Sequence, residues 1–104
     1  MIKSNEILDK ELIEVCQKYL DKYGKTLQVI TAMEELGELI SALSRHFFRE
    51  RLSKSDLASE IADVEIVCQS LRLMIGNDFV DVWKVEKIKR MIKRLNIEKM
   101  VTGK

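Results

Sequence analysis

Apolar residues recur at steps of three and four along most of the chain, a periodicity that predicts α-helices. The pattern is interrupted three times by short polar or glycine-containing segments, which divide it into four stretches. The expected helices cover residues 4–22, 26–50, 56–75 and 78–96, each bound being approximate. Helices of this length with short connections predict an all-α fold, a four-helix bundle of the up-and-down type. The whole chain, 1–104, is expected to form one domain.

Residues at the three interruptions are suited to begin and end helices. Gly24 is placed to cap the end of the first helix, and Thr26 is expected to be the N-cap of the second. Ser53 with Asp56 forms a capping-box pattern before the third helix, although Ser55 is an equally suitable N-cap.

Two of the expected helices carry apolar stripes that persist over three heptads. The stripe of the second helix is Val29, Met33, Leu36, Ile40, Leu43 and Phe47, and that of the third is Leu57, Ile61, Val64, Cys68, Leu71 and Ile75. Further apolar residues occur on the opposite sides of these helices, so some apolar surface should remain for a second subunit. We therefore expect a homo-oligomer, either a dimer or a tetramer.

The composition supports helices and restricts the classes of partner. Among 104 residues there are four glycines and no proline, which argues against turn-rich β architectures. The formal net charge of +1 predicts no attraction of the whole protein to nucleic acid or membrane. The chain begins with an acidic, amphipathic stretch and contains no run of about eighteen uncharged apolar residues, so we expect a cytoplasmic protein without a membrane partner.

Acidic residues are concentrated on the second and third helices. Glu34, Glu35 and Glu38 form an EExxE motif, and Glu60 with Asp63 forms an ExxD motif. Like charges three or four positions apart destabilise a helix by about 0.2–0.5 kcal/mol per pair, a cost that a bound cation would offset. At about 100° per residue, the ExxD acids fall on the shoulder of the apolar stripe rather than opposite it.

Two helices that each present a pair of carboxylates can together supply four oxygen ligands to a hard cation. Mg²⁺ prefers oxygen ligands and usually shares itself with the phosphates of a substrate, so the expected substrate is a polyphosphate. A di-iron site would need Glu-x-x-His, and the single histidine, His46, lies outside both motifs. The alternative is a solvated acidic surface. One acidic motif alone would more often be such a surface, whereas two motifs together favour the metal site.

The fourth helix is strongly basic. Its segment 84–94 holds six bases and one acid, a net charge of +5. By itself such a segment is more often a solvated or nucleic-acid-facing surface. Beside an acidic metal cluster it gains a second interpretation, because anionic phosphates must also be held on the side that the metal does not cover.

The order of these motifs resembles a known family. EELGE at 34–38, EIAD at 60–63 and KIKRMIKRL at 87–95 are similar to the MazG-like all-α nucleoside triphosphate pyrophosphohydrolases, including their small stand-alone bacterial and phage members. The similarity extends over about residues 29–95. It implies hydrolysis of a nucleoside triphosphate to the monophosphate and pyrophosphate with Mg²⁺, or Mn²⁺ in its place, and a role in clearing unwanted nucleotides.

The resemblance also implies roles for particular residues. The metal ligands would be Glu35, Glu38, Glu60 and Asp63; the catalytic acids would be Glu34 and Glu35; the phosphate contacts would be Lys87, Lys89 and Arg90. Some relatives carry a base-stacking tryptophan after the first motif, where this chain reads Arg45-His46-Phe47-Phe48. His46 is therefore the candidate for nucleoside binding, with Phe48 as the alternative. Phe47 belongs to the apolar stripe and is expected in the core.

Two other functions are consistent with the same sequence. One is a non-catalytic helical interaction module, in which the acids bind a partner or solvent and the basic helix contacts nucleic acid. The other is a related pyrophosphohydrolase that acts on phosphoribosyl-ATP, which uses the same metal chemistry. Base preference, sugar preference and the number of metal ions are left open by the sequence.

Overall fold

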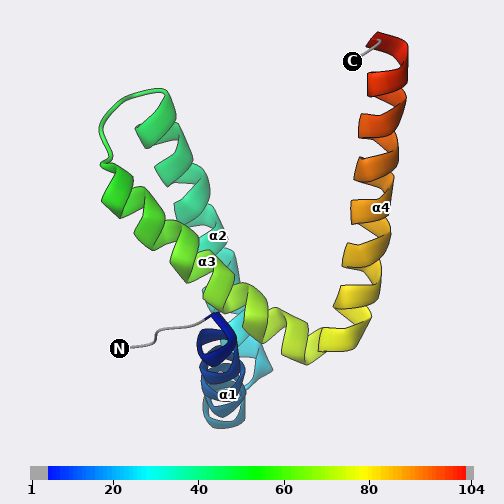
Figure 1. The fold of residues 1–104 in the computed structure, drawn as a ribbon. Coiled ribbons are helices and arrows are strands. Elements are labelled where there is room, and N and C mark those ends of the chain that lie inside the picture. The colour runs from blue at the N-terminus through cyan, green and yellow to red at the C-terminus, as the bar shows by residue number, and fades with distance from the viewer. Residues whose placement is uncertain (1–4, 103–104) are drawn as a thin grey trace. The chain divides into compact units, whose positions relative to one another are not determined.

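Four α-helices make up nearly all of the described chain. The computed structural model describes the backbone of residues 5–102 and the side chains of residues 8–97. The helices are α1 (Asn5–Tyr23), α2 (Lys25–Phe47), α3 (Lys54–Ile75) and α4 (Asn77–Thr102) (Figure 1). Residues 5–102 contain no β-strand, so the all-α prediction is confirmed. Across the same residues, no helix has an apolar window long enough to cross a membrane.

The chain divides into two compact units. The first, Met1–Met74, holds α1, α2 and nearly all of α3, and the second, Ile75–Lys104, holds α4. Within the first unit, α2 and α3 run antiparallel and side by side, joined by the loop 48–53 (Figure 1). Helix α1 lies against the end of this hairpin at which α2 begins. Packing of all four helices into one domain stays a prediction.

Gly24 connects α1 to α2 without any linker. Its φ of 84° is a left-handed conformation that favours glycine. The Gly24 N–H donates to the Leu20 carbonyl at 2.9 Å, which closes α1, and the Gly24 carbonyl accepts from the Gln28 N–H at 3.3 Å, which opens α2. Thr26 therefore lies inside α2, and its prediction as the N-cap was wrong because Gly24 serves both helices.

Ser53 is the N-cap of α3. Its hydroxyl oxygen accepts a hydrogen bond from the Asp56 N–H at 3.0 Å, and its carbonyl accepts from the Leu57 N–H, also at 3.0 Å. The alternative cap, Ser55, lies within the first turn of the helix. The capping-box pattern therefore gave the correct start of α3.

Replacing the capping hydroxyl should destabilise the protein measurably. For Ser53→Ala we expect a loss of about 1 kcal/mol in the free energy of unfolding, or about 4–8 °C in Tm, because an N–H of the first turn loses its acceptor. Thermal melts followed by circular dichroism measure the change. Ser55→Ala is the matched control, and equal losses in the two variants would contradict the assignment of the cap.

The helices of the first unit pack through small and polar side chains. Gln28, Ala32 and Ala42 of α2 and Leu57, Val67 and Ser70 of α3 are buried, as is Cys16 of α1. Small residues at a helix contact allow the two backbones to approach closely. The face of α2 that carries Glu35 and the face of α3 that carries Glu60 and Asp63 therefore turn toward each other.

The predicted apolar stripe of α2 lies outside this packing, whereas the stripe of α3 contributes the buried Leu57. Along α2, the stripe residues Val29 to Phe47 are 39–71% exposed, and on α3 Ile61 is 40% and Ile75 is 70% exposed. Phe47, expected in the core, is 63% exposed, so that prediction was wrong. On α2 the periodicity identified the most apolar side of the helix, whereas the intrachain contact uses the neighbouring side that has small residues.

Gly37 lies in the middle of α2 without any packing reason for a glycine. A Cβ atom added there would meet no atom within 4 Å. Because glycine costs a helix interior about 0.8–1.0 kcal/mol relative to alanine, Gly37→Ala should raise Tm by about 4–8 °C. A thermal melt tests this, and a lower Tm in a protein of unchanged helicity would show that another chain contacts this side of α2.

Candidate metal centre

Three carboxylates from two helices meet at the centre of the α2–α3 hairpin. Glu35 and Glu38 lie one turn apart on α2, and Glu60 faces them from α3. One carboxylate oxygen of each lies within 4.8 Å of those of the other two. We refer to Glu35, Glu38 and Glu60 as the acidic cluster.

Buried helix contacts hold the acidic cluster on both sides. On α2, Ala32 precedes Glu35 by three residues and Ala42 follows Glu38 by four. On α3, Leu57 precedes Glu60 by three residues and Val67 follows Asp63 by four. Because positions three and four apart share one side of a helix, the carboxylates lie on the contact face itself.

Two oxygens of the acidic cluster lack hydrogen-bond partners. Glu35 Oε2 and Glu60 Oε2 are fully buried, and neither has a partner among the described residues. Glu38 is exposed. A buried carboxylate oxygen without a donor or a cation is costly, since its hydration is lost and nothing replaces it. The arrangement is therefore incomplete as a purely structural contact and fits a positively charged ligand.

The electrostatic environment of Glu35 disfavours its charge. Desolvation is the largest cause that raises the pKa of Glu35 above its usual value of 4.5. The carboxylates of Glu38, Asp63 and Glu60 raise this pKa further, in that order, followed by a hydrogen bond with Glu38. A divalent cation would reverse this effect, because its charge favours the ionised carboxylates.

The other two predicted acids lie beside the acidic cluster. Asp63 is half-buried, one turn after Glu60 on α3, and lines a pocket together with Glu35. It is outside the group whose oxygens lie within 4.8 Å. Glu34 is exposed and also outside that group. The structure thus brings together three of the four predicted ligands, with Asp63 next to them.

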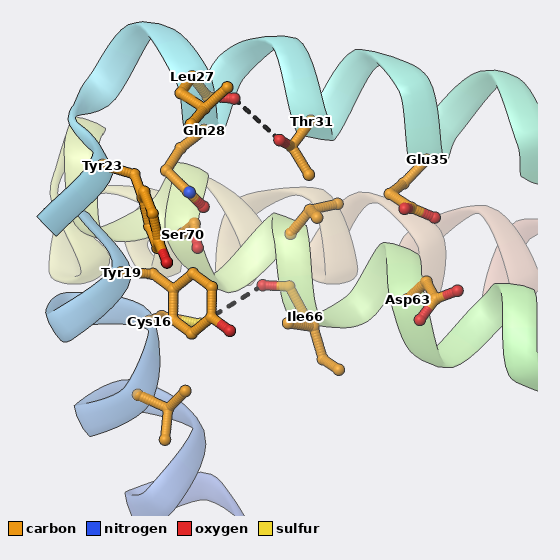
Figure 2. A pocket seen from close by; sticks show the side chains of 12 residues that line it. Cys16, Tyr19, Tyr23, Leu27, Gln28, Thr31, Glu35, Asp63, Ile66 and Ser70 are labelled. Carbon is orange, nitrogen blue, oxygen red and sulfur yellow. Dashed lines mark hydrogen bonds between the residues drawn. The ribbon is translucent and has the colours of Figure 1, made fainter.

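A pocket of about 640 Å³ extends from Glu35 and Asp63 toward α1. Figure 2 shows the two acids at one end and Gln28, Tyr19 and Tyr23 at the other. The sequence analysis did not identify this pocket. The relevant signal was present in the spacing of Gln28, Thr31 and Glu35, which places a polar line on the same side of α2 as the acids.

His46 lies away from this pocket and has a structural contact. Its Nδ1 donates a hydrogen bond to the Leu52 carbonyl at 2.7 Å, which ties the end of α2 to the loop before α3. Its ring contacts the neighbouring Phe47 ring edge-on, with centroids 4.8 Å apart. His46 is absent from the pocket lining, so the predicted nucleoside contact is not close to the pocket that the structure shows.

The predicted phosphate contacts lie on α4, in the second unit. Lys87, Lys89 and Arg90 are all exposed. Lys89 Nζ lies 3.6 Å from Glu86 Oε1, an exposed pair one turn apart on the same helix. Such a pair contributes little to stability and leaves the lysine available to a stronger anion.

Comparison of the chain with protein-family models, with curated proteins and with solved structures found no match.

Proposed function

We propose that the protein is a Mg²⁺-dependent nucleoside triphosphate pyrophosphohydrolase that cleaves NTPs or dNTPs to the monophosphate and pyrophosphate. The observation that carries the proposal is the pair of buried, unpartnered oxygens of Glu35 and Glu60 within the acidic cluster. The resemblance of EELGE and EIAD to the MazG-like enzymes also supports it, since these two motifs contain the three residues of the acidic cluster.

The acidic cluster and Asp63 have the chemistry of a Mg²⁺ site. All four are hard oxygen donors, and the exposed Glu38 leaves one side open to substrate phosphates. When bound, Mg²⁺ neutralises charge on the phosphate oxygens and lowers the pKa of a coordinated water. Mn²⁺ has the same ligand preference and should substitute.

In the proposed reaction, a water oxygen bonds to phosphorus while the phosphoanhydride bond to the departing pyrophosphate breaks. The water proton passes to a carboxylate. Glu35 and Glu34 are the proposed catalytic acids: Glu35 lies in the acidic cluster, and Glu34 is next to it but outside it, so its oxygens are available to orient water. The departing group leaves with the bonding electron pair, which the positive charges around it stabilise.

The basic helix and a second subunit complete the proposal. Lys87, Lys89 and Arg90 are proposed to hold the phosphates, because a substrate carrying this much negative charge needs cations on more than one side. The exposed stripe of α2, Val29 to Phe47, has the 3–4 spacing of a helix-packing seam, and we propose that a second copy covers it. The expected setting is the cytoplasm and the role nucleotide clearance.

A substrate panel tests the proposed function. Purified protein with Mg²⁺ is incubated with NTPs, dNTPs and modified nucleotides, and pyrophosphate release is measured. We expect release from at least one of them, and none without metal. Release only from phosphoribosyl-ATP would contradict this substrate assignment, and no release from any compound, with salt-sensitive DNA binding instead, would support the non-catalytic module.

A further inference from the structure

We infer that the pocket between α1, α2 and α3 binds the nucleobase of the substrate, with Gln28 reading its edge and Tyr19 and Tyr23 contacting its face. This inference rests on the proposed function, and it names a site that the sequence motifs do not include. The pocket is continuous with the acidic cluster, because Glu35 belongs to both. Its volume of about 640 Å³ is within the range of small-molecule sites.

Polar groups form two matching lines along the pocket. On α2, Gln28 and Glu35 are separated by seven residues, two helical turns, which is about 10.5 Å along the axis. On the antiparallel α3, Ser70 and Asp63 are also seven residues apart. Figure 2 shows the two acids together at one end and Gln28 with Ser70 at the other. The lining of the pocket is thus acidic at one end and, two helical turns away, neutral and polar at the other.

The neutral end can form hydrogen bonds in both directions. The Gln28 side chain is 8% exposed and points into the pocket, and Ser70 is 3% exposed (Figure 2). An amide and a hydroxyl each offer a donor and an acceptor. The Thr31 hydroxyl, midway along α2, donates to the Leu27 carbonyl at 2.9 Å and so keeps its oxygen as an acceptor toward the pocket.

Flat surfaces and apolar walls accompany these polar groups. The rings of Tyr19 and Tyr23 have centroids 5.4 Å apart and are inclined at 45°, and each side chain is about half exposed beside the pocket. Val15, Ile66 and Val67 supply apolar contacts in the pocket lining. Aromatic faces of this kind stack on any nucleobase.

The chemical groups of a nucleoside polyphosphate follow the same order as the groups that line the pocket. Its phosphates chelate a divalent cation, a ribose spans the middle, and its base is flat with donors and acceptors on the edge. An inorganic polyphosphate would leave the amide, the hydroxyl and the tyrosine rings without partners. The geometry therefore favours a ligand whose anionic end is joined to a heteroaromatic ring at about two helical turns.

The first test uses uncharged nucleosides, which do not need the metal. Saturation-transfer NMR with adenosine, cytidine, uridine and thymidine measures their Kd for the metal-free protein. We expect binding of at least one nucleoside, weakened about tenfold in Tyr19→Ala because a stacking face is lost. Phe48→Ala is the matched control, since Phe48 is 86% exposed and outside the pocket lining.

The second test distinguishes reading of the base from mere support of the fold. Gln28→Glu replaces an amide by a group that accepts hydrogen bonds only. The ratio of Kd for uridine and thymidine to Kd for adenosine and cytidine should rise about tenfold, because only the latter two carry an exocyclic amino donor. A purely structural role would weaken all four equally.

The outcomes separate this inference from the proposed function. Nucleoside binding that responds to both variants, without pyrophosphate release by the unaltered protein, would refute the function and support the pocket. Pyrophosphate release with unchanged nucleoside affinity and base profile in both variants would support the function and overturn the pocket. Absence of any nucleoside binding by the unaltered protein would also overturn it.

Discussion

Glu60→Gln should reduce kcat/KM for pyrophosphate release by about 10²–10³-fold while leaving the helical fold intact. The substitution keeps the size of a side chain that reaches the centre of the α2–α3 contact and removes its negative charge. Glu60 Oε2 is buried without a hydrogen-bond partner among the described residues, so the substitution breaks no hydrogen bond of that oxygen. Loss of a group that holds charge in the transition state typically costs about 10²–10³ in rate.

Glu65→Gln is the matched control for this variant. Glu65 is on the same helix, carries the same charge and is exposed outside the acidic cluster. We expect nearly unchanged activity in Glu65→Gln and equal circular dichroism in both variants. Comparable losses of activity in the two would mean that the general acidity of α3, rather than the acidic cluster, matters.

Glu35→Gln should have opposite effects on activity and on stability. Activity should be lost, because a proposed metal ligand is removed. Without metal, however, the variant should melt several degrees above the unaltered protein. The amide relieves repulsion with Glu38, Asp63 and Glu60, and its N–H group can donate to a neighbouring carboxylate. Melts in a chelating buffer measure the difference, with Glu34→Gln, an exposed neighbour, as the control.

The pH dependence of the same melts follows from the pKa of Glu35. Because this pKa is raised above 4.5, the native state between 4.5 and the raised value binds more protons than the unfolded state. Glu35 therefore contributes stability at low pH that is lost as pH rises through its folded pKa. In metal-free protein, Glu35→Gln should remove this decline. A variant that melts at or below the unaltered protein at neutral pH would contradict the interpretation.

Local patterns along the chain predicted the helices well. The 3–4 periodicity found all four, because helical spacing is a property of neighbouring residues. Of the two N-caps that the sequence left open for α3, Ser53 and Ser55, the structure uses Ser53, whose partner is three residues away. The start of α2 was missed because Gly24 caps two helices at once through its positive φ, a conformation that the sequence offers but does not require.

The side on which α2 packs was not predictable from apolarity. Buried Ala32 and Ala42 are less apolar than Met33 and Ile40, which are exposed, yet the small residues form the contact. Packing depends on the side chains of both helices at once, whereas the apolar stripe is a property of one helix. The spacing of the acids predicted three residues that the structure brings together, Glu35, Glu38 and Glu60. The pocket beside them has α1 as a third wall, so the polar line on α2 alone did not define it.

The central claim is that the acidic cluster binds a divalent cation, and a thermal melt with increasing Mg²⁺ tests it most directly. The unaltered protein should gain about 2.7 kcal/mol of unfolding free energy at a hundredfold excess of Mg²⁺ over Kd. A double variant, Glu35→Gln with Glu60→Gln, should gain nothing, while Glu65→Gln should behave as the unaltered protein. An equal rise of Tm in the double variant, or no rise in the unaltered protein at any Mg²⁺ concentration, would contradict the claim.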